Sequence, residues 1–264
     1  QLRKAVDQEH QRAFALFDRL LALWRAEQFP FEGGKSMLPQ TLIPKSIRED
    51  EHLLARFFFF ACVYMRGGIT SSTAFRGLVA MWQNVPLMFE PEVAHTWERA
   101  RVEEYLKTYV GGWDLKTASY NWQENAARLA TTWNSDVRNI FQGVSTYEQA
   151  LFRIRNKHGK HENPVDQGFV GYQHKMTSML CYFLVDAGII HGFFFPPPVD
   201  FHHLRILLGH ELLLVDTAGT SVRYSERILG PARDLLTTYL KTRGSDRPLL
   251  HLELADALWL FSLT

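Results

Sequence analysis

Two side chains within residues 165–211 have the types and placement that covalent or electrostatic catalysis needs. Lys175 stands at the head of an apolar helical segment, and Asp200 follows a loop of three phenylalanines and three prolines at the start of another. An unprotonated lysine amine is a nucleophile, and a fixed carboxylate stabilises a developing positive charge. A carboxylate at a helix N-terminus also caps the helix, so capping is the structural alternative for Asp200.

A glycine-containing turn and a basic run precede these two residues. Gly168, Val170 and Gly171 lie between two helical segments, where glycine permits positive φ and a close approach of the backbone. The N–H groups of such a hairpin can bind a DNA phosphate, although a plain helix connection is the alternative. The basic run supplies further candidate phosphate ligands, or else a solvated charged loop: Arg153, Arg155, Lys157 and Lys160.

The sequence gives no pattern for a metal or cofactor site. Cys62 and Cys181 are too few for an iron–sulfur cluster or a four-thiolate zinc site. The best histidine cluster lacks the HExxH spacing of a zinc enzyme; it consists of His202, His203 and His210 with Glu211. We therefore expect no metal and no cofactor.

The composition is that of a globular protein, and its overall charge is close to neutral. The 264 residues carry a net charge of +1, 46% of them are hydrophobic and 22% are charged. Any phosphate contact must therefore come from a local patch. The longest apolar run, residues 57–65, is too short to span a bilayer. With two cysteines in apolar runs and no disulfide framework, we expect a reducing, cytoplasmic location and no membrane contact.

Apolar residues recur at helical spacing along most of the chain, and no convincing alternating strand pattern appears. The pattern predicts an all-α protein of about ten to twelve helices. We expect one compact unit that divides into two helical lobes, one of residues 50–160 and one of residues 1–49 with 161–264. The clearest helices are expected at residues 5–27, 49–65, 70–82, 90–109, 118–133, 146–157, 225–241 and 248–263.

The order of these features resembles the helix–hairpin–helix base-excision DNA glycosylases across residues 167–208. In that superfamily a glycine-rich hairpin is followed by a lysine or another polar residue, and then by a Pro-Val-Asp entry to a helix. The strongest match is the tripeptide Pro198-Val199-Asp200 followed by Phe201, His202, His203, Leu204 and Arg205. The resemblance implies a helix–hairpin–helix glycosylase-like bundle that acts as a monomer on double-stranded DNA with a modified or flipped base.

The resemblance also implies roles for individual residues. Asp200 would stabilise the oxocarbenium-like sugar as the C1′–N bond breaks, and Lys175 would form the Schiff base of a glycosylase that also cleaves the strand. The usual lysine position holds Gln173 in this chain, and the interval from Lys175 to Asp200 (200 − 175 = 25) is longer than the commonest one. Without the lysine amine the enzyme would be monofunctional. Base flipping needs aromatic faces and polar edges, and the candidates are Trp122, Trp133, Asn125, Phe195 and Gln173.

The substrate and the class of function stay open at this level. An oxidised purine is the first expectation for the excised base, and a hypermodified base of the phage type is the second. A resemblance to queuosine-salvage nucleoside glycosidases, which are all-α and use an aspartate before an aromatic residue, implies instead a free modified nucleotide. The third alternative is a non-catalytic, all-α nucleic-acid-binding module that uses the hairpin as a phosphate clamp.

Overall fold

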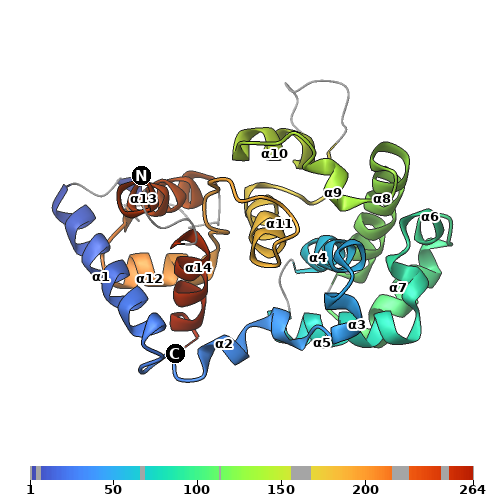
Figure 1. The fold of residues 1–264 in the computed structure, drawn as a ribbon, viewed down its shortest axis with the longest axis horizontal. Coiled ribbons are helices and arrows are strands. Elements are labelled where there is room, and N and C mark those ends of the chain that lie inside the picture. Colours follow the sequence, from blue (N-terminus) through green and yellow to red (C-terminus); the bar gives the residue numbers. More distant parts are fainter. Residues whose placement is uncertain are drawn as a thin grey trace. The chain divides into compact units, whose positions relative to one another are not determined.

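The computed structural model describes residues 2–3, 7–65, 69–112, 114–155, 168–215, 226–244 and 250–263, and within them the protein is all-α (Figure 1). The all-α prediction is confirmed. The described residues form fourteen α-helices, of which α2, α3, α6 and α9 are single turns of four residues. The strand content of these residues is one antiparallel pair of two-residue strands, β1 (Leu2–Arg3) and β2 (Leu214–Val215).

The chain forms two compact units. The terminal unit comprises residues 1–37 and 194–264, and the central unit comprises residues 38–193. These limits differ from the expected lobes, because residues 161–193, which carry the hairpin and Lys175, belong to the central unit and not with Asp200. The reason lies in the packing of α11 (His174–Asp186) against α4 (Glu51–Tyr64), two helices far apart in sequence.

In the central unit α4 is the core helix. The Asp50 side chain caps it by accepting hydrogen bonds from the N–H groups of the second and third residues of the helix, and residues 54–64 are all buried. A helix that is apolar on every side must be enclosed by other elements. Consecutive phenylalanines meet different neighbours: Phe58 stacks on Phe183 of α11, and Phe60 stacks on Trp122 of α8 (Leu115–Trp133).

The central unit has further elements. They are η1 (Pro39–Leu42), α3 (Lys45–Arg48), α5 (Ser71–Asn84), η2 (Pro86–Phe89), α6 (Pro91–Ala94), α7 (Arg99–Tyr109), α9 (Val137–Ile140) and α10 (Tyr147–Ile154). Of these, α3, α5, α9 and η2 contact α4. The single helix expected at residues 90–109 is wrong, since the segment divides into α6 and α7. The break is held by Gln123, whose side-chain amide donates to the carbonyl of Trp97, and Glu98 then starts α7 in an extended conformation.

The terminal unit packs four long or medium helices and one single turn. They are α1 (Asp7–Arg25), α2 (Gly34–Met37), α12 (Phe201–Gly209), α13 (Glu226–Arg243) and α14 (Leu250–Phe261). Helix α14 contacts both α1 and α12, and α12 also contacts α13. Tyr239 of α13 packs edge-on against Phe14 and Phe17 of α1 and donates a hydrogen bond to Asp18 at 2.7 Å. These contacts join the first helix of the chain to its last segments.

Gly77 marks a close approach between α5 and the end of α7. A Cβ atom added there would lie 2.5 Å from the Tyr109 carbonyl oxygen and 2.8 Å from the Val110 Cα. Because both atoms belong to the backbone, the helices must separate to admit a methyl group. We expect Gly77→Ala to lower the free energy of unfolding by about 1–3 kcal/mol, despite the better helix propensity of alanine.

Gly209, at the end of α12, provides the matched control for this substitution. An added Cβ there has no neighbouring atom within 4 Å, so Gly209→Ala should leave stability unchanged or raise it by up to about 1 kcal/mol. Urea unfolding followed by circular dichroism measures both variants. Equal midpoints for Gly77→Ala and the wild type would contradict the close approach.

Candidate functional site

Asp200 is held at the start of α12 by a buried approach segment and by local hydrogen bonds. Residues 195–199 before it are all buried, and prolines in this segment fix φ along its path. Oδ1 of Asp200 accepts a hydrogen bond from the His202 N–H at 2.9 Å and lies 3.1 Å from Nδ1 of His203. The Asp200 side chain remains 13% exposed. The carboxylate is thus fixed in position and still reaches solvent.

His203 is a partner of Asp200 that the sequence analysis missed. Its side chain is 3% exposed, and Nδ1 accepts a hydrogen bond from the backbone N–H of Asp200 at 3.3 Å. The backbone N–H of His203 in turn donates to the Asp200 side chain, which completes a capping box. The sequence signal is the spacing, because a side chain three residues after an N-cap can reach back to the cap. Within the described ranges, no group of three or more His, Cys, Asp and Glu side chains is placed to hold a metal ion.

Exposed aromatic rings with cations beside them occur before and after Asp200 in the chain of the terminal unit. Phe201 follows Asp200 directly and is 41% exposed, and the Arg205 guanidinium lies 5.8 Å from its ring centroid. Phe194 is equally exposed, and the Lys241 ammonium lies 5.9 Å from its ring centroid. Such pairs offer a flat apolar face beside a positive charge. They are the surface features nearest in sequence to Asp200 that could meet a base and a phosphate.

Phe195, predicted as part of a base pocket, is instead a core residue of the terminal unit. It is 1% exposed, and its ring packs edge-on against the imidazole of His251 with 4.5 Å between centroids. Within the described residues, Nε2 of His251 is buried and has no hydrogen-bond partner. This burial lowers the pKa of His251 from 6.5 to about 4.

The lowered pKa of His251 makes stability depend on pH in a defined direction. Between pH 6.5 and about 4 the unfolded chain binds a proton at this position that the folded chain does not bind. The stabilisation is therefore complete above pH 6.5 and is lost as the pH falls toward 4, by at most about 3 kcal/mol. We expect His251→Leu to flatten the dependence of the unfolding free energy on pH between 6.5 and 4.5, measured by urea unfolding at several pH values.

The exposed His191 supplies the control for this pH dependence. His191→Leu removes an exposed imidazole in place of a buried one, so it tests whether the slope follows the burial of His251 and not the number of histidines. A His251→Leu variant that loses stability on acidification as steeply as the wild type would show that other groups cause the loss.

Lys175 belongs to the central unit, where it is the second residue of α11. Its side chain is half-buried, and its helix packs against α4, which carries Cys62. Burial raises the pKa of the Cys62 thiol, and the charge of Lys175 opposes that shift. Asp200 belongs to the terminal unit. A shared role for the two residues stays a prediction.

Two other residues predicted for the base pocket are core residues of the central unit. Trp122 is fully buried, stacks on Phe60 and donates its indole N–H to the Met88 carbonyl at 2.9 Å. Asn125 is also fully buried, and its amide exchanges hydrogen bonds with both the N–H and the carbonyl of Val170 at 2.6 and 2.9 Å. These contacts correct the prediction, because neither side chain presents a face or an edge to a ligand.

The glycine turn is fastened to the core by the same contacts. The Val170 N–H, predicted to bind phosphate, is buried and already donates to Asn125. The Gly168 carbonyl accepts a hydrogen bond from Arg128 of α8. Gly171 has φ of +82°, which agrees with its predicted role of allowing a tight turn. The correction concerns Val170, since a donor inside the core cannot meet a phosphate.

Arg153 and Trp133 are linked to each other and to the turn that follows α9. The Arg153 guanidinium donates to the carbonyls of Ile140 and Gln142, both at 2.8 Å, and lies 5.9 Å from the Trp133 ring centroid. Trp133 is half-buried. These hydrogen bonds within the protein account for the position of Arg153, and no bound phosphate is needed to explain it. The role of Trp133 in binding a base stays a prediction.

Arg155 and Gln173 connect the end of α10 to the start of α11. The Arg155 Nε donates to the Gln173 side-chain oxygen at 2.8 Å, and Gln173 is exposed. The pair lies beside the glycine turn, because Arg155 is bridged to Phe169. Lys157 and Lys160, the other predicted phosphate ligands, lie outside the described residues.

A cavity of about 480 Å³ lies in the central unit, between the α9 region and the segment after α11. Its lining includes Asn139, Gln142 and His191 with Phe141, Ile190 and Phe193. It contains none of the residues predicted for the site from sequence.

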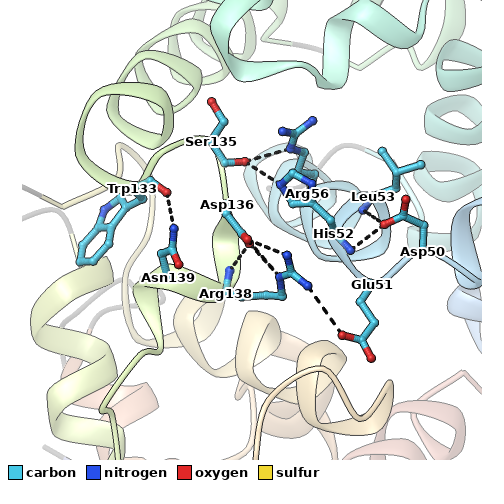
Figure 2. A network of polar contacts seen from close by, with 10 residues as sticks. All are labelled: Asp50, Glu51, His52, Leu53, Arg56, Trp133, Ser135, Asp136, Arg138 and Asn139. Atoms are coloured by element: carbon cyan, nitrogen blue, oxygen red, sulfur yellow. Dashed lines mark hydrogen bonds and ion pairs between the residues drawn. The ribbon is translucent and has the colours of Figure 1, made fainter.

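A polar network fixes the connection from α8 to α9 beside this cavity (Figure 2). Arg56 and His52 of α4 both contact the Ser135 carbonyl, at 2.9 and 3.2 Å. Arg138 forms a two-pronged contact with Asp136. Burial acts to raise the pKa of Asp136, but the hydrogen bonds from Arg138 outweigh it and lower that pKa below its usual value. The network holds this connection in place, and its charged side chains pair with one another.

Comparison of the chain with protein-family models, with curated proteins and with solved structures found no match. Among the described residues, no helix has both the length and the apolar character needed to cross a membrane.

Proposed function

We propose that this protein is an N-glycosylase that hydrolyses the C1′–N bond of a modified nucleotide in DNA, with Asp200 as the catalytic carboxylate. The observation that carries the proposal is the fixed and partly exposed carboxylate of Asp200 at the start of α12. It follows a buried, proline-rich segment, the feature on which the resemblance to the glycosylases also rests. A simple helix cap does not require such an approach.

Cleavage of the C1′–N bond requires a negative charge near the sugar. As the C1′–N bond breaks, the electron pair leaves with the base and the sugar becomes an oxocarbenium-like cation. A preorganised carboxylate stabilises that charge without having to move, and water then adds to C1′ while its proton is transferred toward the departing base. This monofunctional scheme needs Asp200 alone. A Schiff base with Lys175 is a further step that the same assay tests.

Exposed aromatic rings and cations in the terminal unit support a nucleotide as the substrate. Phe201 and Phe194 expose ring faces on which a base can stack, and Arg205 and Lys241 place positive charges beside these rings. Cys62 and Cys181 are buried and form no disulfide, which agrees with action in the reducing cytoplasm.

A free modified nucleoside or nucleotide is the second candidate substrate. The observation that favours it is the internal use of the predicted phosphate donors, because the Val170 N–H is bonded to Asn125 and Arg153 is bonded to two carbonyls. A duplex is held largely by contacts to its phosphates. The absence of such donors weakens the binding of DNA more than it weakens the binding of a small substrate.

The test is base release under single-turnover conditions. Duplexes that contain an oxidised purine or a hypermodified pyrimidine are incubated with the protein in parallel with the free nucleosides, with and without borohydride. Release from duplex alone supports the DNA glycosylase, and release from nucleosides alone supports the second candidate. A trapped adduct that disappears in Lys175→Ala would add strand-cleaving activity. Binding of DNA with no release from any substrate would exclude catalysis on these bases.

A further inference from the structure

The cavity between the α9 region and the segment after α11 has the size of a small-molecule site. Its volume of about 480 Å³ falls within the range of roughly 300–1,000 Å³ that ligand pockets occupy. Two stretches far apart in sequence, residues 136–144 and 189–193, supply its lining. The apolar part of the lining consists of Phe141, Val144, Ile189, Ile190 and Phe193. Contact with these side chains favours a ligand that has an apolar face.

Three polar side chains in the lining have hydrogen-bonding capacity that the protein leaves unused. Asn139 donates one amide hydrogen to the Trp133 carbonyl at 3.0 Å. Its second amide hydrogen and its side-chain oxygen have no partner among the described residues. The side chains of Gln142 and His191 are exposed and form no hydrogen bond within the part of the chain that the structure describes. Carboxamides and imidazoles both donate and accept, so this lining can pair with either kind of group on a ligand.

Arg138 and Asp136 are the permanently charged side chains of this lining, and they pair with each other. The Arg138 guanidinium donates to the Asp136 carboxylate from Nε at 3.0 Å and from Nη2 at 2.7 Å. Its third nitrogen, Nη1, lies 3.7 Å from the Glu51 carboxylate. A cation that already faces two carboxylates offers little attraction to an added anion. The cavity therefore favours an uncharged ligand over a phosphate.

The connection from α8 to α9, which leads into this lining, is held in place by the core of the central unit (Figure 2). Ser135 is buried and has a φ of +58°, a conformation that residues other than glycine adopt rarely. Its carbonyl accepts a hydrogen bond from Arg56 at 2.9 Å, and its hydroxyl donates to Glu92 at 2.9 Å. Backbone of this kind persists where its surroundings determine it, and it is frequent at ligand sites. A ligand therefore meets a preformed wall that it does not have to order.

We propose that this cavity binds an uncharged nitrogen heterocycle, namely a free nucleobase or its nucleoside. The apolar side chains contact the flat ring. The carboxamides of Asn139 and Gln142 each offer a donor and an acceptor, the pair of groups with which such side chains bind the edge of adenine. His191 adds a third polar group at the exposed part of the lining. The site goes beyond the proposed function, because neither Asp200 nor Lys175 lines it.

The test is isothermal titration calorimetry of the whole chain with adenosine, guanosine, cytidine and thymidine, and with the free base of each. We expect saturable binding of at least one of these probes. Gln142→Ala removes a polar group from an exposed position of the lining and should weaken that binding about 3- to 10-fold. Gln83→Ala is the matched control, because Gln83 is an exposed glutamine of the same unit that lies outside the lining. It should leave the affinity unchanged.

A second variant and a charged probe complete the test. Val144→Trp fills the cavity and should weaken binding at least about 10-fold, with circular dichroism to show that the variant is folded. The 5′-monophosphate of the nucleoside that binds should bind no more tightly than the nucleoside itself. No saturable binding of any probe, or equal affinity in the wild type and Gln142→Ala, overturns the proposal. A 5′-monophosphate that binds more than about 10-fold tighter also overturns it, because the cavity would then recognise a phosphate. None of these measurements uses base release, so their failure leaves the proposed function untouched.

Discussion

Replacing Asp200 with asparagine is expected to lower the single-turnover rate of base release at least about 100-fold. Asparagine has nearly the same shape and remains a good N-cap, so its oxygen can still accept the His202 N–H. The change removes the negative charge that the oxocarbenium-like transition state needs. The measurement is the release of a modified base, followed by chromatography, under the conditions in which the wild type is active.

A matched control separates catalysis from capping, because the chain has another aspartate with the same structural duty. Asp114 caps α8 by accepting a hydrogen bond from the Thr117 N–H at 3.1 Å. Asp114→Asn and Asp200→Asn should each change the unfolding free energy by less than about 1 kcal/mol. Only Asp200→Asn should slow base release. A wild-type rate in Asp200→Asn would reduce Asp200 to a helix cap.

The helices were predictable because their signals are local. The apolar run of residues 57–65 indicated a buried helix, and α4 is enclosed on all sides. The start of α12 at Asp200 followed from the Pro-Val-Asp sequence and the known preference of aspartate for the N-cap. The break between α6 and α7 was not predictable, since it depends on a hydrogen bond from Gln123, a residue of another helix.

The site was harder to predict because it depends on which face of a helix is buried. Residues 115–133 form one helix whose buried side carries polar residues. In a sequence, polar residues at helical spacing usually indicate the side of a helix that is exposed to solvent. Asn125 and Trp122 were therefore expected to line a base pocket, although tertiary packing encloses both. His203 could have been found from its spacing to Asp200. The packing of α11, which carries Lys175, against α4 is a tertiary contact that the sequence does not encode locally.

Asn125→Leu is expected to cause the largest loss of stability among the substitutions considered, about 2–5 kcal/mol. Leucine is close to asparagine in shape and fits an enclosed position, but it makes no hydrogen bond. The N–H and the carbonyl of Val170 would each lose the partner that Asn125 provides at 2.6 and 2.9 Å. Val170 is itself buried, so water cannot replace the lost contacts without opening the turn.

Asn121 provides the matched control for Asn125→Leu. It lies one helical turn earlier on α8 and is 2% exposed, yet within the described residues its side-chain nitrogen is buried without a hydrogen-bond partner. Removing an unpartnered buried donor releases a penalty, so Asn121→Leu should be neutral or stabilising within about 1 kcal/mol. Urea unfolding of the two variants, which share residue type, helix and burial, then isolates the hydrogen bonds to Val170. Equal losses would mean that packing, and not these bonds, holds the glycine turn to the core.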